Sequence, residues 1–313
     1  MLTKINVKWE EAAVSHFMTE LIDYAGLFPP AALPLAEAIS NYHSYIHGSD
    51  SWMLGPFVIP ASRLNELQPF AVQFNDQYPL RLTVILSKSE AIEKEIEAMN
   101  LFLETYNTAG TIEAVEIPLP EKVDFSFLKK LEQYTEDYPV YCEMTGTNQE
   151  ILRTLDTVSS LNQISSKSIG VKMRMGGITA DLFPSAERAA FIIHETQKRG
   201  LAIKFTAGLH HPIRQYRNEV ETKMHGFVNV FTASIMAYCH SINIDTIQDI
   251  LLDEDPANFS FTKEALSWRH FTVTSAEIDK ARTLFAASYG SCSFDEPREE
   301  LGELTIFQGE AVQ

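Results

Sequence analysis

Short apolar strands alternate regularly with helical segments from about residue 53 onward, and this alternation limits the fold to a few architectures. Strand starts recur roughly every 25–33 residues, which is the length of one strand–helix unit. The strands are rich in apolar and β-branched residues, as expected when both faces of a sheet are covered. We predict strands over residues 53–60, 80–87, 112–118, 139–145, 168–175, 201–206 and 227–232.

An eighth strand would complete the set, and the sequence offers two segments for it, residues 259–266 and 268–273. Strict alternation of strands and helices is typical of α/β folds, and eight such units close into a barrel. A doubly wound open sheet is the alternative, but no strand is followed by a Gly-x-Gly-x-x-Gly turn or a Walker A loop. We therefore predict a (β/α)8 barrel of the TIM type.

The chain of 313 residues suits a single domain, because parallel barrels commonly take about 250 residues. No linker rich in Gly, Pro or Ser divides it. We expect a helical extension over residues 1–50, the barrel over 51–275, and a C-terminal helix and tail over 276–313. Within these parts, helices are predicted over residues 8–24, 34–47, 89–106 and 276–289, and the tail after them is acidic.

Charge and cysteine content exclude several classes of function. The formal net charge of -17 argues against a nucleic-acid partner, because neutralising phosphates needs a basic face. Three scattered cysteines are too few for a disulfide framework. There is neither a leader-like N-terminus nor an apolar run of about 18 residues, so we expect a cytoplasmic protein without a membrane partner. We expect no cofactor, and the sequence leaves a homo-oligomer open.

Cations share one face on two successive predicted strands. Side chains of a strand alternate between faces, so Lys172 and Arg174 point the same way, as do Lys204 and Thr206 on the next strand. In parallel barrels the active site is built at the carboxyl ends of the strands. These residues therefore predict a charged mouth that binds a small anionic metabolite.

Lys204 is the main catalytic candidate. Burial beside Lys172 and Arg174 would lower its pKa and give a neutral amine able to attack a carbonyl group. A cation that only binds substrate, or a structural ion pair with Glu116 or Glu143, are the other interpretations. The two glutamates are candidates for the catalytic base or for lysine partners, and among them we favour Glu143 for proton transfer.

Further residues are expected to bind substrate. Arg174 presents a guanidinium fork suited to a carboxylate or phosphate, and Gly176 and Gly177 would let backbone N–H groups approach it. Alternatively, the two glycines only turn the chain. The other polar residues near predicted strand ends are Lys172, Glu116, Thr206, His211, Arg214 and Asn229.

Two adjacent histidines follow the sixth predicted strand. His210 is a candidate for general acid–base catalysis because imidazole titrates near neutral pH. A metal would require Glu116, Glu143 or His225 to meet one of these histidines in space, and we assign no metal ligand. Cys292 lies in a Gly-Ser-Cys-Ser run, but nothing near it in sequence supplies a base, so a loop or interface contact is the preferred interpretation.

Two resemblances accompany these residues. The run Ile-Lys-Phe-Thr-Ala-Gly, residues 203–208, resembles the sixth-strand segment of deoxyribose-phosphate aldolases and implies an imine-forming Lys204. The second lysine of that family has no counterpart, since Asn229 occupies the region. Tyr-Ala-Gly-Leu-Phe-Pro-Pro-Ala at 24–31 and Thr-Ala-Gly-Leu-His-His-Pro at 206–212 resemble an uncharacterised bacterial barrel family, which implies no activity. Residues 23–30 would cover the pocket or plug the other end of the barrel.

This pattern is compatible with three functions. The first is an aldolase-like lyase acting on a small anionic carbonyl compound, with Lys204, Glu143 and His210 as catalytic residues. The second is a metal-assisted lyase or hydrolase. The third is a binding or sensor protein that holds an anion without converting it. The fold alone does not decide among them, because barrels support many reactions.

Overall fold

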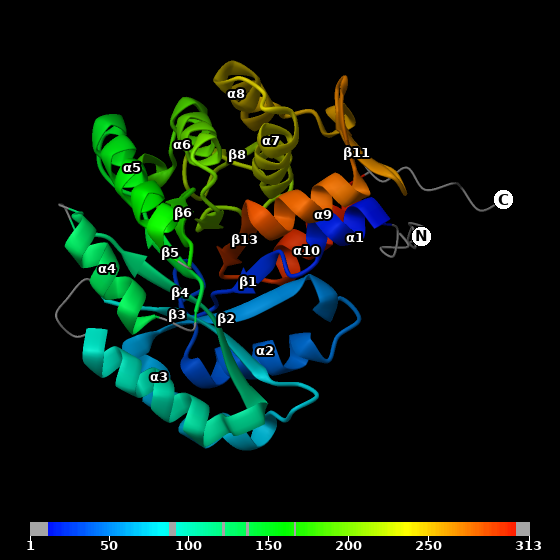
Figure 1. The fold of residues 1–313 in the computed structure, drawn as a ribbon. Helices are drawn as coiled ribbons and strands as arrows, with labels where there is room; N and C mark the ends of the chain where they lie inside the picture. The colour runs from blue at the N-terminus through cyan, green and yellow to red at the C-terminus, as the bar shows by residue number, and fades with distance from the viewer. Residues whose placement is uncertain (1–11, 88–91, 121–122, 136–137, 166, 305–313) are drawn as a thin grey trace, which may run out of the picture.

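The computed structural model describes residues 12–87, 92–120, 123–135, 138–165 and 167–304 (Figure 1). Eight of the described strands pair in parallel and close into a barrel in the order β1-β13-β7-β6-β5-β4-β3-β2. The predicted (β/α)8 barrel is confirmed. The barrel strands are β1 (Ile22–Tyr24), β2 (Leu54–Pro60), β3 (Leu80–Ile85), β4 (Gly110–Pro118), β5 (Val140–Glu143), β6 (Ile169–Arg174), β7 (Ile203–Thr206) and β13 (Ala286–Ser291).

Helices surround the strands, and α3 to α6 follow one another around the outside of the barrel (Figure 1). A 3-10 segment, Ala61–Gln73, takes the place of an α-helix between β2 and β3. The α-helices are α1 (Ala12–Met18), α2 (Leu35–Ile46), α3 (Ile92–Tyr106), α4 (Phe125–Tyr134), α5 (Asn148–Ile164), α6 (Ala186–Lys198), α7 (Phe227–His240), α8 (Ile244–Leu252), α9 (Ser275–Leu284) and α10 (Asp295–Glu303).

The connection from β7 to β13 carries the additions to the basic barrel. After β7 come a hairpin of β8 (Gln215–Arg217) and β9 (Thr222–Met224), then α7 and α8. A three-stranded antiparallel sheet follows, made of β10 (Phe259–Phe261), β11 (Ala265–Trp268) and β12 (Phe271–Thr274). A capping box at Thr274 and Glu277 then starts α9.

Two predicted strands are wrong, and their errors have a common cause. Residues 227–232 form the start of α7, which is buried on every side, and a short apolar run does not distinguish a buried helix from a buried strand. The segments 259–266 and 268–273 do contain strands, but these belong to the small antiparallel sheet outside the barrel. The other six predicted strands, β2 to β7, are confirmed.

The predicted boundaries of the barrel are also wrong. Its first strand, β1, lies inside the supposed extension 1–50, and its last strand, β13, lies inside the supposed terminal part 276–313. β1 has three residues, too few for an alternating pattern. β13 reads Ala-Ala-Ser-Tyr-Gly-Ser, without the β-branched residues that mark a strand, and for this reason the predicted helix 276–289 runs into it.

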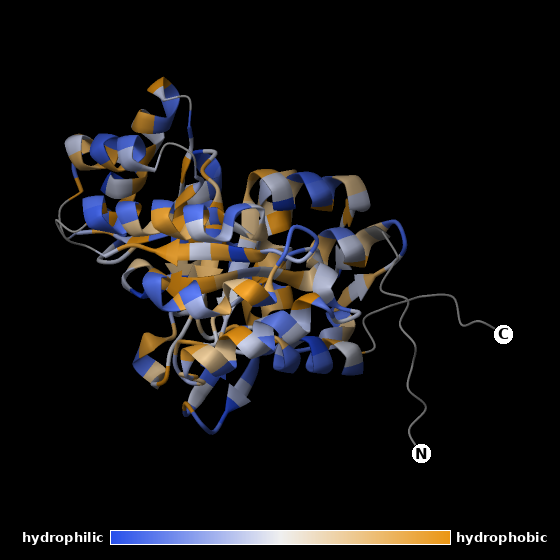
Figure 2. Cartoon of the chain, turned by 90° about the horizontal axis from the view of Figure 1, so that it is seen from below, coloured by the Kyte–Doolittle hydropathy of each residue, from blue (hydrophilic) through white to orange (hydrophobic). Residues whose placement is uncertain are grey.

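The hydrophobic core lies between the strands and the helix layer, and apolar residues dominate the strands in Figure 2. None of the described helices has both the length and the apolar character needed to cross a membrane. The predictions made for residues 8–11 and 89–91, and for the tail from residue 305, lie outside the described residues.

Candidate active site

Five charged side chains form a connected network inside the barrel, which we call the interior chain: Asp23, Lys204, Glu116, Lys172 and Glu143. The Lys204 Nζ lies 2.5 Å from an Asp23 oxygen and 2.7 Å from a Glu116 oxygen. The Lys172 Nζ lies 2.7 Å from the other Glu116 oxygen and 3.1 Å from Glu143. Carboxylates and ammonium groups therefore alternate along this network of side chains.

Strand register explains why these residues meet. Glu143 of β5 is aligned with Lys172 of β6, which is aligned with Lys204 of β7. Side chains at aligned positions of neighbouring strands point to the same face, here the barrel interior. Glu143 is the last residue of β5, so the interior chain reaches the carboxyl end of the barrel there, where its side chain is 17% exposed.

The electrostatics of Lys204 differ from the sequence-based expectation. Burial disfavours its ammonium form, but Asp23 and Glu116 outweigh burial and raise the pKa of Lys204. The prediction of a lowered pKa is wrong because it counted neighbouring cations and missed Asp23. Burial also acts against ionised Glu116, yet the two lysines lower its pKa to about 2. At Asp23, burial outweighs the effect of Lys204, and the pKa of Asp23 is raised.

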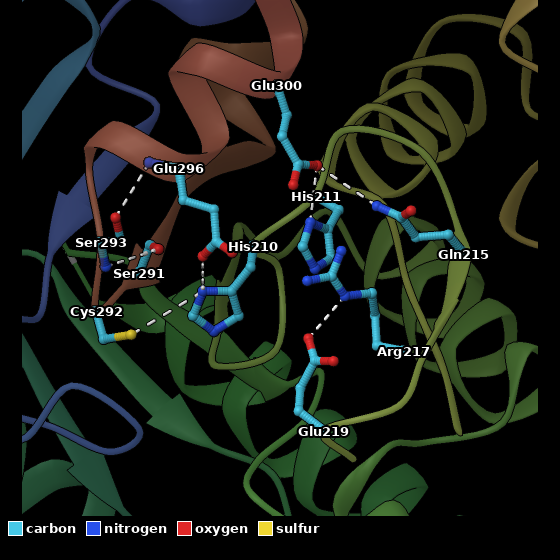
Figure 3. Close-up of polar contacts among 10 residues, drawn as sticks. All are labelled: His210, His211, Gln215, Arg217, Glu219, Ser291, Cys292, Ser293, Glu296 and Glu300. Carbon is cyan, nitrogen blue, oxygen red and sulfur yellow. Dashed lines mark hydrogen bonds and ion pairs between the residues drawn. The ribbon is translucent and has the colours of Figure 1, made fainter. Parts of the chain in front are cut away.

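A second group of reactive side chains lies at the carboxyl end of the barrel, and we call it the mouth cluster: His210, Cys292 and Glu296 (Figure 3). The His210 Nδ1 is 4.0 Å from the Cys292 Sγ and 3.2 Å from a Glu296 oxygen. Burial alone would lower the pKa of His210, but the contacts with Cys292 and Glu296 raise it to about 9. His210 is therefore held as an imidazolium at neutral pH.

His211 lies beside the mouth cluster and has partners of its own. Its Nδ1 is 2.8 Å from a Glu300 oxygen, which also accepts a longer bond from Gln215 (Figure 3). Ligand atoms of His211, Glu296 and Glu300 lie within 4.8 Å of one another. Glu296 and Glu300 are four residues apart on α10 and so share a face of the helix. An imidazole with two carboxylates could hold a divalent metal ion.

The residues predicted to bind an anion lie at the end of β6. Arg174 is exposed there, and its Nε donates to the Gly176 carbonyl oxygen at 2.9 Å. A Cβ on Gly176 would lie 2.8 Å from the Gly208 Cα, and one on Gly177 would lie 2.4 Å from a Leu182 carbon. Close packing alone therefore explains why both positions hold glycine, and anion binding at this place stays a prediction.

Other predicted residues separate into two groups. Thr206 ends β7 and lies next to Gly290, at the carboxyl end of the barrel. Asn229 belongs to α7, not to a strand, and is fully used by the backbone: its amide donates to two carbonyl oxygens and accepts from the Arg214 N–H. Arg214 itself contacts His225, whose pKa burial lowers to about 4. These last three residues stabilise the loop.

The loop after β1 lies at the carboxyl end of the barrel, since the Ala25 N–H donates to the Ser291 carbonyl oxygen at the end of β13. This resolves the alternatives left by the sequence, because residues 23–30 do not plug the amino end. Asp23 points inward from β1, while the residues after it lie beside the mouth.

A cavity of about 390 Å³ opens at the opposite, amino end of the barrel. Glu20, Pro139 and Thr283, which precede β1, β5 and β13, line it, and Lys204 and Tyr141 close its inner end. Charged groups that line the cavity have partners within the protein. Glu20 pairs with Arg81, and His16 pairs with Asp279. Arg282 donates hydrogen bonds to backbone carbonyl oxygens.

Sequence reasoning missed the mouth cluster as a unit. His210 was recognised from its position, but Cys292 and Glu296 are 82 and 86 residues away in the chain. The run Gly-Ser-Cys-Ser was visible, and recognising β13 before it would have placed Cys292 at a strand end.

Comparison with protein-family models, with curated proteins and with solved structures finds no match to this chain. The barrel is compatible with an enzyme, since this fold supports many reactions at its carboxyl end. The interior chain and the mouth cluster are two groups of ionisable and reactive side chains that this barrel brings together.

Proposed function

We propose that the protein is an enzyme acting on a small anionic carbonyl compound at the carboxyl end of the barrel, with aldolase-like lyase chemistry. The interior chain carries this proposal. Ionised groups are expensive to bury, and a barrel core can be filled with apolar residues instead. Two ammonium groups and three carboxyl groups inside one barrel therefore favour a role beyond stability.

Four members of the interior chain, Lys172, Glu143, Lys204 and Asp23, have a place in this reaction. Lys172 and Glu143 lie nearest the mouth, where Lys172 would attract the negative charge of the substrate. Lys204 would attack the carbonyl carbon, and water would leave to give an imine. The protonated imine then accepts the electron pair of the neighbouring carbon–carbon bond as that bond breaks, while Glu143 takes the hydroxyl proton of the departing fragment, which leaves as a carbonyl compound.

Lys204 must lose a proton before it can attack. Asp23 is the acceptor nearest to it, at 2.5 Å, and burial already raises the pKa of this carboxyl group. Proton transfer from Lys204 to Asp23 would give a neutral amine beside a neutral acid. If this transfer does not occur, Lys204 acts as a cation that polarises the carbonyl group, and no imine forms.

Borohydride trapping tests the proposal. The folded protein is incubated with keto acids, aldehydes and sugar phosphates, reduced, digested and analysed by mass spectrometry. We expect a stable adduct on Lys204, and none on exposed Lys198 with the same compound. Turnover is measured in parallel with Lys204→Arg, since a guanidinium cannot form an imine. Full turnover by this variant would exclude the imine route. If no compound of the panel forms an adduct or is turned over, the enzyme proposal is contradicted.

A metal-assisted lyase or hydrolase is the second candidate, supported by the convergence of His211, Glu296 and Glu300. Zinc and manganese suit such a mixture of imidazole and carboxylate. Calorimetric titration with each ion should give one site per chain, and His211→Gln or Glu300→Gln should abolish it. If binding is unaffected by either variant, the ion binds elsewhere.

A protein that only binds its anion would behave differently from both enzymes. Lys204→Ala would then weaken ligand binding, with no turnover to lose. Measuring affinity and turnover for the same panel of compounds distinguishes this third function.

A further inference from the structure

Cys292 directly follows β13, at the carboxyl end of the barrel, and its side chain points toward His210 (Figure 3). β13 pairs with β7, and His210 lies in the loop after β7. Thus two neighbouring strands deliver a thiol and an imidazole to the same place. In barrel enzymes, residues in this position on the strands are the ones that contact substrate.

Both partners are held by their local structure. The turn after β13 is fixed by two serines: the Ser291 hydroxyl accepts the Ser293 N–H, and the Ser293 hydroxyl accepts the Glu296 N–H. On the other side, Ala207 and Gly208 have positive φ and turn the chain after β7 toward His210. Gly208 also packs closely on Gly176, where a side chain would not fit. These hydrogen bonds and turns therefore fix the positions of the thiol and the imidazole relative to each other.

The three cysteines have different surroundings. Cys142 is fully buried on β5, and burial raises its pKa to about 12. Cys239 on α7 is partly exposed; its Sγ contacts the Glu277 carbonyl oxygen at 3.7 Å, and burial raises its pKa to about 11. Cys292 is partly exposed as well, but its partner is an imidazole. A neighbouring histidine is what activates a thiol as a nucleophile.

We propose that Cys292 is a nucleophilic residue that adds to the carbonyl carbon of a substrate bound at the mouth, with His210 donating a proton to the carbonyl oxygen. In this step the Cys292 thiol gives up its proton to solvent, and its sulfur forms a bond with the carbonyl carbon. The π electrons of the carbonyl group move to its oxygen, which takes the Nδ1 proton of the His210 imidazolium, and His210 regains a proton from solvent. The product is a hemithioacetal, and the reverse steps release the compound unchanged.

This proposal takes its electrophile from the proposed function, whereas the reactivity of the thiol is independent of it. Glu296 contacts the same His210 nitrogen as Cys292 and is a positioning residue. Its carboxylate would keep the imidazole turned toward the thiol. The interpretation to be excluded is that Cys292 only fills space beside the loop.

The first measurement is the rate at which each cysteine of the folded protein reacts with iodoacetamide, followed by peptide mass spectrometry. A chelator is present throughout, so that a bound metal cannot hide the thiol. We expect Cys292 to react faster than Cys239 by about tenfold or more, because Cys292 has an imidazole beside it, whereas burial raises the pKa of Cys239. Cys142 should react only after unfolding.

His210→Gln should slow labelling of Cys292 by about tenfold and leave Cys239 unchanged. Glu296→Gln, which keeps the shape of the side chain, should slow the labelling of Cys292 less than His210→Gln does. Circular dichroism and Tm confirm that each variant is folded. Equal rates for Cys292 and Cys239, or no effect of His210→Gln, would overturn the proposal.

Glyoxylate, a small anionic aldehyde, tests the addition step. It should protect Cys292 from iodoacetamide at concentrations that leave Cys239 unprotected. If iodoacetamide labels Cys292 fast but glyoxylate does not protect it, the thiol is reactive but does not add to a carbonyl group. That result would overturn the proposed addition step. Protection without any Lys204 adduct or turnover would instead support the thiol and contradict the aldolase-like function, so the two failures are distinguishable.

Discussion

The interior chain and the mouth cluster both combine cationic and acidic groups, but they differ in how completely those groups are paired. In the interior chain, Lys172 and Lys204 each contact two carboxylates at 3.1 Å or less and are almost fully buried. In the mouth cluster, His210 contacts Cys292 at 4.0 Å, and the Glu296 side chain is 40% exposed. The lysines of the first set are paired away from solvent, whereas the second set is more loosely paired and reaches solvent at Glu296.

The difference decides what each set can contribute. Removing one partner from a buried ion pair leaves an uncompensated charge away from water. Near the surface, water replaces a lost partner at little cost. The interior chain should therefore affect stability strongly, and the mouth cluster should affect reactivity with little effect on stability.

The largest expected effect comes from Glu116→Gln, which removes the carboxylate shared by Lys172 and Lys204. We expect the free energy of unfolding to fall by about 3–5 kcal/mol, the usual result of breaking a buried pair. Urea denaturation measures it. Glu66→Gln, at an exposed pair with Arg63, is the control and should cost no more than about 1 kcal/mol. Equal losses in the two variants would show that the interior chain is not desolvated.

The pH dependence of the same residue gives the next largest effect. The pKa of Glu116 is lowered from 4.5 to about 2 in the folded protein. Its ionised form therefore stabilises the fold above pH 4.5, and this contribution, about 3 kcal/mol, is lost as the pH falls toward 2. The difference in unfolding free energy between the wild type and Glu116→Gln should shrink over this range. A constant difference would contradict a lowered pKa.

The smallest expected effect on stability comes from Glu296→Gln in the mouth cluster. Because Glu296 is partly exposed, we expect a loss of no more than about 1 kcal/mol. The pKa of His210, followed by NMR titration, should fall below its value of about 9, since one of its anionic contacts is gone. A loss as large as that of Glu116→Gln would remove the contrast between the two regions.

Local patterns in the sequence predict much of the barrel and part of the site. Six strands, β2 to β7, could be recognised because each is an apolar run of ordinary length between turn signals. The placement of Lys172 and Lys204 on one side of their strands followed from the alternation of side chains. The errors fall on β1, β13 and α7, where the segment is too short, too small in its side chains or too evenly apolar for periodicity to distinguish strand from helix.

The βα alternation, and hence the barrel and the inward-facing lysines, follow from the sequence alone, since they depend on residues near one another in the chain. Which charges meet depends instead on how the chain folds in three dimensions. Closing the barrel brings β1 next to β13 and places Asp23 against Lys204, which raises the pKa of that lysine instead of lowering it. It also brings Cys292 to His210 across 82 residues. Coulombic and hydrogen-bond energies depend on distances of a few ångströms, which spacing along the sequence does not encode.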